Sequence, residues 1–539
     1  MKRIIVISIL LLIFTGLFAQ TKDTLYILET TDVHARIFPY NYYTDEPDEI
    51  GFAQVYSRIQ EYRKKFKNVI LLDGGDAIQG TPMAYYFHKI ENDKPNPIIL
   101  AMNEMKYDAF AVGNHEIEQG VEVYTKAMNE SEFPWLSANS TLSDSSTFFQ
   151  PYTILEKDGI KIGVIGLTTP GIPTMLDTVC YPGITWTDMV KTAQKYAKIV
   201  RPKVDILVGL FHAGFDAGED AYKSKQLGLP VANASGLVAD SIPEFDLIFG
   251  GHSHRVKPKE KINPPVDECM KIIAGKWGIY LGVSKFVLEK KRNKWKIIDK
   301  SGWVESVAGQ EPSAEILVLT SDYHDAILEY IRTNIAEIRD TILGTNSRFE
   351  DSPIVELINK AQMDYTGADI SFAASFRTDY CFEPGKLQIK DAYSMYPYEN
   401  FLYVAEMTGQ QIRDYLEAST KYYLFDGEIV KTNPEIAGYH CSMAEGIDYE
   451  IDLSEKIGKR IKNIKLSTSG LPLQNNKKYK VALNSYRASG GGGLMEAAGA
   501  KNAPIVFKSN EEMRTILINY LMEKGSISAE VDKNWKILK

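Results

Sequence analysis

The sequence is poor in three features that would each indicate a class of protein. Four cysteines in 539 residues are too widely spaced for a metal cluster or a disulfide framework, so we expect free thiols at least as readily as a bridge. Lysine and arginine total 61 against 70 aspartates and glutamates, so the chain lacks the basic excess that binding a long nucleic acid requires. Beyond the N-terminus, no apolar run is long enough to cross a bilayer. The length favours two domains, and a small anionic ligand stays possible.

The one long apolar run lies at the N-terminus. Lys2 and Arg3 precede an apolar stretch that ends near Phe18, which is typical of a signal peptide with cleavage near Ala19 or Gln20. A membrane anchor is the alternative, but the run is short for a span of about 20 residues. We therefore predict that residues 1–20 are a signal peptide and that the mature chain is periplasmic or secreted.

Short β-rich runs alternate with helical patterns through the first half of the chain. This order is typical of an α/β sandwich with a buried sheet. The expected strands are residues 24–32, 68–76, 107–115, 160–169, 204–214 and 245–254, and the expected helices include 52–66 and 97–106.

Histidine is scarce, with eight in the chain, yet five of them stand where predicted strands end. Since the carboxyl ends of parallel strands form the binding crevice of an open α/β sheet, these side chains are expected to meet at one edge. We interpret His88 and His324, which lie elsewhere, as ordinary structural histidines. The polar residues at strand ends are Asp32, His34, Asp73, Asp76, Asn114, His115, His212, His252 and His254.

This mixture of imidazole, carboxylate and amide groups without thiolates suits zinc, manganese or iron. The number of ligands suggests two divalent ions, and two ions about 3.5–4 Å apart favour hydrolysis of an anionic ester, most plausibly a phosphate ester. We predict Asp32, His34 and His254 for one ion, Asn114, His212 and His252 for the other, and Asp76 as the bridge.

His115 follows the predicted ligand Asn114 and is expected to contact the substrate. As an imidazolium it would stabilise charge on the phosphate or protonate the departing oxygen. Glu118 is the candidate that orients it. The alternative is a purely structural role for His115.

The pattern changes in the second half of the chain. Residues 312–345 read as one long helix that connects two domains, and from about 346 a mixed α+β domain follows. The expected organisation is a signal peptide at 1–20, a phosphoesterase domain at 21–315, a linker helix at 316–345 and a C-terminal domain at 346–539.

Five motifs in order, TTDVH, DGGD, GNHE, FHAG and GGHSH, resemble those of the calcineurin-like metallophosphoesterases. The resemblance covers nearly the whole mature chain and extends to the exported 5′-nucleotidase family. Local runs such as IIAGKWGIYLGV, EGIDYEID and VALNSYRASGGGG are most similar to the periplasmic 2′,3′-cyclic-nucleotide 2′-phosphodiesterase/3′-nucleotidase branch. The resemblance implies a four-layer αββα domain, a linking helix and a C-terminal nucleotide-recognition domain.

The resemblance also implies roles for individual residues. It makes His115 the catalytic imidazole, has Tyr439 and Tyr486 sandwich the nucleoside base, and puts Arg377 in a substrate-contacting segment. Glu118 departs from the Asp or Asn that the family carries at that position. The aromatics of MYPYENFL at 395–402 are interpreted as packing, and GGGG at 490–493 as either a close approach to a ligand or a flexible turn.

The implied activity is hydrolysis of 2′,3′-cyclic nucleotides and 3′-nucleotides to nucleoside and phosphate, for nucleotide scavenging. The partner is a small nucleotide, with no nucleic-acid polymer and no membrane after signal removal, and the oligomeric state stays open. A 5′-nucleotidase or UDP-sugar hydrolase on the same scaffold is the first alternative. A non-catalytic exported nucleotide-binding protein and a sulfur-ester hydrolase are the others.

Overall fold

The computed structural model describes residues 21–291, 294–398 and 400–538, so the predicted signal peptide at 1–20 lies outside the described residues. Within the described ranges, no helix combines the length and apolarity needed to span a membrane. The chain divides into two compact units, which we describe separately. Besides the segment before Asn41, the N-terminal unit holds Pro47–Ile172 and Asp177–Tyr323, and the C-terminal unit holds Asn41–Glu46, Pro173–Leu176 and His324–Lys539.

The N-terminal unit contains two six-stranded sheets. The first has the order β16-β15-β1-β4-β5-β6, with β1, β4, β5 and β6 parallel to one another and β15 antiparallel to β1 and β16. Its strands are β16 Lys294–Ser306, β15 Tyr280–Lys291, β1 Lys22–Thr30, β4 Asn68–Asp73, β5 Ala109–Ala111 and β6 Trp135–Leu136.

The second sheet has the order β13-β14-β12-β11-β9-β8, and its four inner strands are parallel. Its strands are β13 Val256–Lys257, β14 Met270–Ala274, β12 Leu247–Gly250, β11 Ile206–His212, β9 Ile160–Thr168 and β8 Tyr152–Lys157. The six predicted strands in this half of the chain are all present, each ending slightly before its predicted limit.

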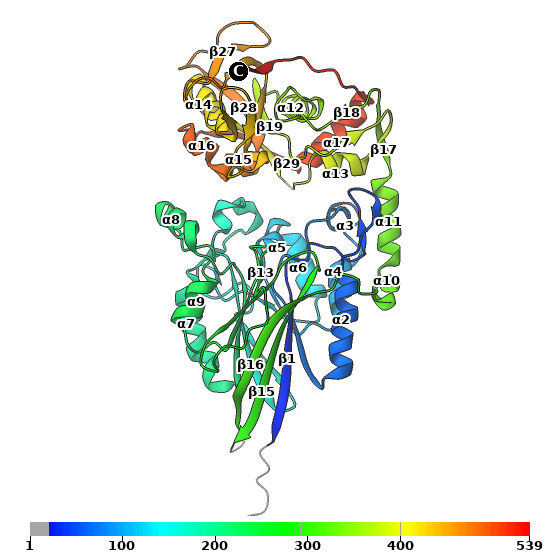
Figure 1. The fold of residues 1–539 in the computed structure, drawn as a ribbon, viewed down its shortest axis with the longest axis vertical. Helices are drawn as coiled ribbons and strands as arrows, with labels where there is room; N and C mark the ends of the chain where they lie inside the picture. The colour runs from blue at the N-terminus through cyan, green and yellow to red at the C-terminus, as the bar shows by residue number, and fades with distance from the viewer. Residues whose placement is uncertain (1–20, 292–293, 399, 539) are drawn as a thin grey trace, which may run out of the picture. The chain divides into compact units, whose positions relative to one another are not determined.

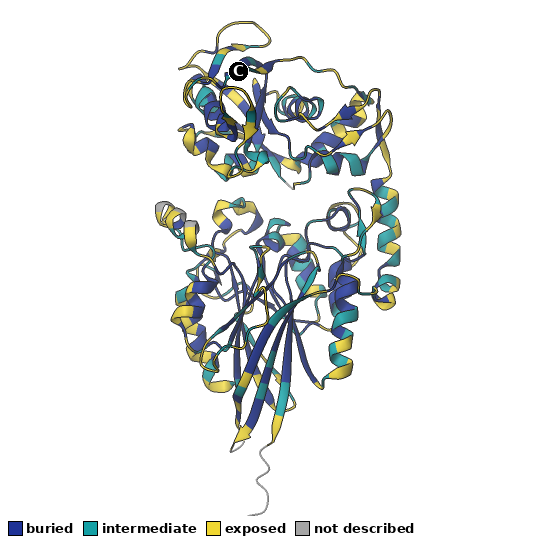
Figure 2. Cartoon of the chain, viewed as in Figure 1, coloured by how far each residue is buried: buried dark blue, intermediate teal, exposed yellow. Residues whose placement is uncertain are grey.

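The two sheets pack face to face around one apolar core. Leu25 and Ile27 of β1 share this core with Val208 and Leu210 of β11, and all four are fully buried. Because parallel strands in this position are covered on both faces, their sequences are almost continuously apolar, and Figure 2 shows them as dark-blue ribbons.

Helices cover the outer faces of both sheets (Figure 1). On the second sheet, α7 Met189–Val200 and α9 Ser235–Ser241 contribute to a separate buried cluster with residues such as Phe245. On the first sheet, α2 Phe52–Lys65 packs against β4, and α4 Pro97–Met105 lies on the same side. The predicted four-layer αββα fold class is confirmed.

The C-terminal unit is mixed α+β, as predicted. Its main sheet has the order β25-β19-β28-β22-β29. These strands are β25 Ser442–Glu445, β19 Ile370–Ala374, β28 Lys478–Asn484, β22 Phe401–Thr408 and β29 Ile505–Glu512, and the main helices are α12 Pro353–Thr366, α14 Gly409–Ser419 and α17 Met513–Lys524.

The predicted long helix at 312–345 is wrong in its second half. Two helices, α10 Ala314–Leu319 and α11 Ser321–Ile331, are followed by strand β17 Asn334–Ile338. β17 pairs with β21 Gly385–Gln388 and with β30 Ser526–Ile527. These partners are distant in sequence, so local helical spacing could not reveal the pairing that selects a strand.

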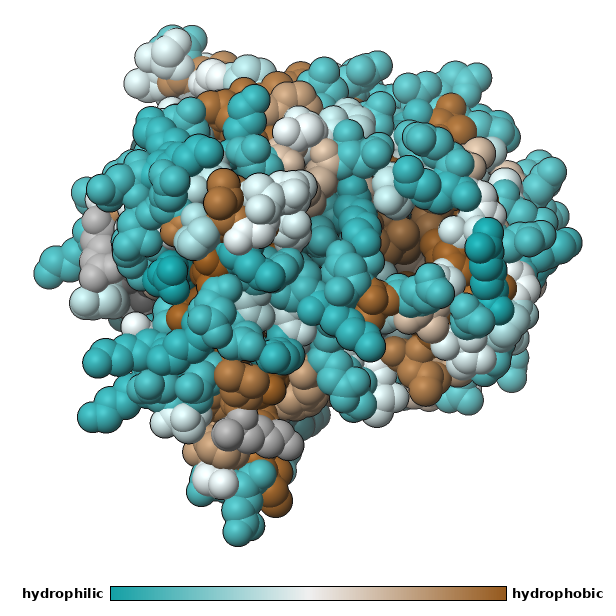
Figure 3. All heavy atoms as spheres, turned by 90° about the horizontal axis from the view of Figure 1, so that it is seen from above, coloured by the Kyte–Doolittle hydropathy of each residue, from teal (hydrophilic) through white to brown (hydrophobic). Residues whose placement is uncertain are grey.

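All four cysteines are free: Cys180, Cys269, Cys381 and Cys441. On the face of the molecule seen from above, apolar side chains occur as separate patches among hydrophilic ones (Figure 3). Scattered apolar residues of this kind are normal on a protein surface.

Candidate active site

The predicted metal ligands converge because five strands end at the same place. Asp32 follows β1, Asp76 follows β4 and Asn114 follows β5, while His212 is the last residue of β11 and His252 follows β12. Three of these strands belong to the first sheet and two to the second. The site is therefore built where the carboxyl ends of both sheets meet, as the sequence pattern predicts.

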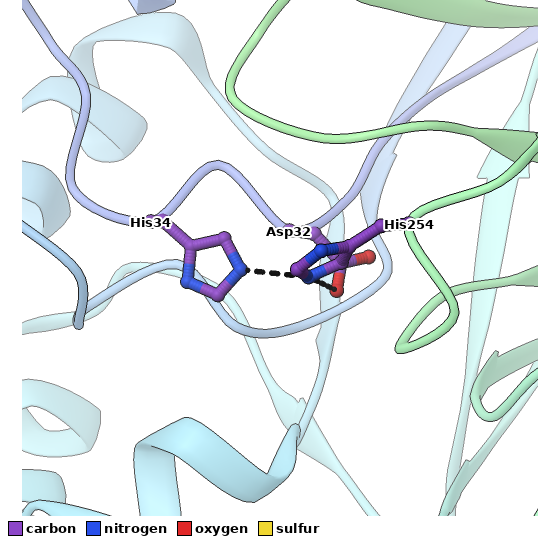
Figure 4. Close-up of side chains that lie close together, drawn as sticks. All are labelled: Asp32, His34 and His254. Carbon is purple, nitrogen blue, oxygen red and sulfur yellow. Dashed lines mark hydrogen bonds and ion pairs between the residues drawn. The ribbon is translucent and has the colours of Figure 1, made fainter. Parts of the chain in front are cut away.

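The first group consists of Asp32, His34 and His254, whose ligand atoms all lie within 4.8 Å of one another. The Nε2 atoms of His34 and His254 are 3.0 Å apart, and His254 Nε2 is 3.3 Å from Oδ1 of Asp32 (Figure 4). Nδ1 of His34 lies 3.1 Å from Oε1 of Gln79, an atom that can only accept, so Nδ1 carries the proton and Nε2 presents its lone pair.

The second group contains Asp76, His212 and His252. Nδ1 of His212 donates to the carbonyl oxygen of Gly74 over 2.8 Å, which leaves a lone pair on Nε2. That nitrogen faces Oδ2 of Asp76 at 3.0 Å and Oδ1 of Asn114 at 3.1 Å. Three acceptor atoms pointing at one another repel unless a cation lies among them, so the donor set fits a metal ion.

The electrostatics of the two groups agree with this reading. Burial disfavours a charged His212, yet the carboxylates of Asp76 and Asp32 outweigh burial and raise its pKa to about 9. The carboxylates around His212 therefore stabilise a positive charge near Nε2, which a proton or a metal ion would supply. Burial lowers the pKa of His34 and of His252 to about 4, which keeps both rings neutral and able to bind a metal.

Both carboxylate oxygens of Asp76 have partners within the site. Its Oδ1 accepts the backbone N–H of His115 over 2.8 Å, and its Oδ2 faces His212. Burial raises the pKa of Asp76, but His212 and His115 lower it well below its usual range, so the carboxylate is ionised. The structure groups Asp76 with His212 and His252, and its bridging role stays a prediction.

Backbone strain marks the same positions. Five of the predicted ligands have a positive φ although none is glycine, a conformation that costs about 1–3 kcal/mol each and persists only where the surroundings enforce it. The values are 51° for Asp32, 52° for His34, 58° for Asp76, 66° for His252 and 56° for His254.

Glu116 is a site residue that the sequence reasoning missed. Its buried carboxylate accepts four backbone N–H groups at 2.7–3.2 Å, from Asp76, Ala77, Ile78 and Gly113. It therefore ties the loop after β4 to the turn that carries Asn114. The only available signal was its place in GNHE, because an acidic residue beside a histidine does not reveal which backbone it will bind.

His115 is the second residue of the short helix α5 Asn114–Glu118. Its Nδ1 lies 2.5 Å from Oε2 of Glu118, so the longer glutamate side chain does reach the imidazole. The His115 ring is also 5.4 Å, centroid to centroid, from that of His34. The imidazole thus lies beside the first metal group, partly exposed and held by a carboxylate.

In the C-terminal unit, the predicted substrate residues differ in how well they suit that role. Tyr486 is 40% exposed and available for stacking. Arg377 pairs with Asp379 over 2.9 Å and donates to Oγ of Ser394 over 3.0 Å, which satisfies its guanidinium locally. That arrangement favours the simpler reading of Arg377 as a surface ion pair.

Tyr398, which was interpreted as packing, does contact two other rings and is also well exposed. Its ring is 44% exposed and lies 6.1 Å from that of Tyr439 and 5.3 Å from that of Phe376. Tyr398 and Tyr439 meet edge to face, and burial, with Tyr439 and Tyr486 nearby, raises the pKa of Tyr398. We call Tyr398, Tyr439 and Tyr486 the tyrosine cluster.

The glycine run at 490–493 allows a close approach, although to protein rather than to a ligand. A Cβ at Gly491 would lie 2.5 Å from ring atoms of Tyr486, and one at Gly492 would lie 2.2 Å from Nη1 of Arg487. A side chain at either position would force the Tyr486 ring or the Arg487 guanidinium to move, so the run packs against Tyr486 and Arg487 and is more than a flexible turn.

Comparison with known families assigns both halves of the chain. Residues 25–256 match the calcineurin-like phosphoesterase family, and residues 334–499 match the 5′-nucleotidase C-terminal domain. The first match contains every predicted metal ligand together with His115 and Glu118. The second contains the tyrosine cluster and the glycine run.

Several bacterial phosphoesterases are similar to this chain over nearly its whole length. The trifunctional nucleotide phosphoesterase protein YfkN of Bacillus subtilis is 28% identical over 96% of this chain, which spans 39% of that longer protein. The 2′,3′-cyclic-nucleotide 2′-phosphodiesterase/3′-nucleotidase of Haemophilus influenzae is 28% identical over 95% of this chain and 87% of its own length. A solved structure of a proposed 5′-nucleotidase from Staphylococcus aureus, 22% identical, shares the fold with a TM-score of 0.79 over 96% of this chain and 100% of its own.

Proposed function

The chain belongs to the calcineurin-like phosphoesterases that carry a 5′-nucleotidase C-terminal domain, and from this premise we propose that it hydrolyses 2′,3′-cyclic nucleotides and 3′-nucleotides to nucleoside and phosphate. The observation that carries the hydrolytic part is the pair of ligand groups, Asp32, His34, His254 and Asp76, His212, His252, each with its atoms within 4.8 Å. A protein that only bound nucleotides would have no need of such a pair.

Calcineurin-like phosphoesterases use two divalent ions, and the donor sets described above fit zinc, manganese or iron. The chemistry that bound ions supply is neutralisation of the phosphate charge and activation of water. The two triads would hold them, with Asn114 beside the second, and the proposal gives Asp76 the bridging position.

The side chains of this protein complete the reaction at the leaving group. Glu118 accepts the Nδ1 proton of His115, so any proton that His115 gives to the departing oxygen comes from Nε2. Glu116 keeps Asp76 and Asn114 in register, because its carboxylate binds the backbone on both sides of the site. In this way the chain would position His115, as the proton donor, next to a phosphate whose charge the bound ions neutralise.

The C-terminal unit supplies the nucleoside-binding groups in this proposal. Aromatic rings stack on bases with about 1–3 kcal/mol each, and the exposed rings of Tyr398 and Tyr486 suit that task. The proposed base-binding group is therefore the tyrosine cluster, which adds Tyr398 to the pair that the resemblance implies, Tyr439 and Tyr486. Contact of Arg377 with substrate has no support beyond the resemblance.

The order of the relatives favours the cyclic and 3′ substrates. Three relatives named 2′,3′-cyclic-nucleotide 2′-phosphodiesterase/3′-nucleotidase are 27–28% identical over 95–98% of this chain. Relatives named 5′-nucleotidase, 26–27% identical, align over 88–89%. The second candidate is therefore a 5′-nucleotidase on the same scaffold.

One assay distinguishes the candidates. Purified protein reconstituted with manganese or zinc is given 2′,3′-cyclic AMP, 3′-AMP, 5′-AMP and UDP-glucose in parallel, and products are followed by chromatography. We expect kcat/KM to be highest for the first two. Faster release from 5′-AMP would replace this assignment with the second candidate, and no turnover of any nucleotide would overturn both.

We also propose export. Residues 1–20 have the composition of a signal peptide, and one solved relative, from Thermus thermophilus, is named a 5′-nucleotidase precursor. A mature N-terminus near Gln20, measured on protein recovered from the periplasm or medium of expressing cells, would support this. An intact N-terminus in the cytoplasmic fraction would contradict it.

A further inference from the structure

Arg487 is a buried cation in an unusual setting. Arg487 is 5% exposed, and the hydrogen bonds of its guanidinium go to backbone carbonyl oxygens rather than to a carboxylate. Instead, Nη1 donates to the carbonyl oxygen of Gly491 over 3.0 Å and Nη2 donates to the carbonyl oxygen of Tyr439. Because a guanidinium presents its N–H groups in a rigid planar fork, these two carbonyls are held at a fixed separation.

The two carbonyls belong to the backbone beside two members of the tyrosine cluster. One is that of Tyr439 itself. The other is that of Gly491, which packs so closely against the ring of Tyr486 that a Cβ would lie 2.5 Å from ring atoms. The guanidinium carbon of Arg487 is 5.6 Å from the centroid of the same ring.

We propose that Arg487 is a positioning residue that sets the spacing and tilt of Tyr439 and Tyr486, and so determines how the C-terminal unit binds a nucleoside ring. The proposal rests on the proposed nucleotide function. Burying a charge without a carboxylate is costly, and the two carbonyl bonds offset that cost only while both segments stay in place. Lysine would keep the charge but lose the fork.

The glycine run provides a test that leaves Arg487 itself unchanged. Gly492 and Gly493 have similar backbone angles, with φ of 73° and 69°. A Cβ at Gly492 would lie 2.2 Å from Nη1 of Arg487, whereas a Cβ at Gly493 would meet nothing within 4 Å. Gly492→Ala therefore displaces the guanidinium and also crowds the ring of His440, 3.0 Å from that Cβ. Gly493→Ala introduces only the backbone strain common to both, and Arg487→Lys tests the guanidinium without crowding His440.

The experiment measures kcat and KM for 3′-AMP and for p-nitrophenyl phosphate, and the Kd for adenosine, in metal-loaded wild type, Gly492→Ala, Gly493→Ala and Arg487→Lys. We expect Gly492→Ala and Arg487→Lys to raise KM for 3′-AMP and Kd for adenosine by about 10-fold, close to the loss of one base stack. Turnover of p-nitrophenyl phosphate, which has no base, should stay within about twofold, and Gly493→Ala should resemble wild type.

Each other outcome counts against the proposal. Equal effects of the two alanine variants would assign the change to backbone strain. A parallel loss on p-nitrophenyl phosphate would assign it to general damage, and unchanged adenosine binding in an active enzyme would leave Arg487 without a positioning role. A wild-type protein that neither binds adenosine nor cleaves 3′-AMP would remove the proposed function first and this inference with it.

Discussion

His212 and Gly74 join the two sheets at the active site, with the ring Nδ1 of His212 2.8 Å from the carbonyl oxygen of Gly74. His212 ends β11 of the second sheet, and Gly74 directly follows β4 of the first. This one bond fixes the tautomer of a predicted metal ligand. The chemistry of the site therefore depends on the packing of the two sheets and not on either sheet alone.

Asp76 and Asp73, three residues apart in DGGD, should respond in opposite ways to the same change. Asp76→Asn removes a charged ligand that faces His212, so we expect loss of at least one metal per molecule and loss of nearly all activity. Burial raises the pKa of Asp73 well above its usual range, and its oxygens accept hydrogen bonds from Thr30 Oγ1 and from the backbone N–H of Gly75, so Asp73→Asn should keep metal and activity. Metal analysis and phosphate release measure both effects.

Chelation provides the control for that pair. Wild-type protein stripped with EDTA should lose activity and recover it on adding manganese or zinc. Activity that survives complete stripping, or that survives in Asp76→Asn, would contradict the dimetal mechanism.

His115 and Glu118 should affect turnover without affecting metal content. His115→Ala removes the proposed proton donor, and general acids of this kind contribute about 10²–10⁴-fold to rate. Glu118→Ala removes the group that holds Nδ1 at 2.5 Å, so we expect a smaller fall in kcat, about 10-fold. A His115→Ala variant with normal kcat, or one that has lost its metals, would exclude the catalytic role.

Glu116 should control metal affinity although it is not a predicted ligand. A glutamine at this position has one acceptor oxygen in place of two, so Glu116→Gln leaves two of four backbone N–H groups without a partner. Groups that orient metal ligands typically change affinity by about 10–100-fold, and we expect a loss of that size for manganese or zinc. Titration of the stripped variant measures it, and an unchanged affinity would contradict the role.

Sequence alone was sufficient where a signal is local and repeated. Apolar runs predicted six strands of the N-terminal unit, β1, β4, β5, β9, β11 and β12, and the polar residues at their ends predicted the crevice. The sequence was insufficient where the structure of a segment depends on pairing with segments distant in the chain. β17 Asn334–Ile338 has the composition of a helix end and becomes a strand because β21 and β30 pair with it.

The tyrosines illustrate the same limit. The chain has 31 tyrosines, so aromatic identity alone could not separate an exposed ring such as Tyr398 from a buried one such as Tyr396, two residues earlier. Glu116 was missed for a related reason, since its four backbone partners come from loops that meet only in the folded chain.

The tyrosine cluster should affect nucleotides and spare substrates without a base. Tyr486→Ala and Tyr398→Ala each remove an exposed ring, so KM for 3′-AMP should rise by about 10-fold or more while p-nitrophenyl phosphate is turned over normally. Tyr439→Ala should also raise KM for 3′-AMP, because Tyr439 meets Tyr398 edge to face at 6.1 Å and belongs to the same cluster. Equal losses on both substrates would contradict base stacking.

An acidic cluster in the C-terminal unit should make stability depend on pH. Glu445, Asp351, Glu356 and Asp532 lie close together, with Lys360 as the nearby cation. Burial, together with Asp532, raises the pKa of Glu445 to about 8, and burial, together with Glu356, raises that of Asp351 to about 6. Both folded-state values exceed those of the unfolded chain, so the folded protein binds these protons more tightly.

The sign of the pH effect follows from that difference. The stabilisation from these protons is complete below the unfolded values of about 4 and is lost as pH rises through about 6 and then about 8. Glu445→Gln cannot ionise, so it should match wild type at pH 5 and exceed its Tm at pH 8 by several degrees, on the order of 1–2 kcal/mol. Thermal unfolding across pH 5–9 measures this, with the pH 5 values as the internal control. A constant difference between the two proteins over that range would show that Glu445 does not titrate there, and a variant less stable at pH 8 would mean that the ionised carboxylate is instead bound by Lys360.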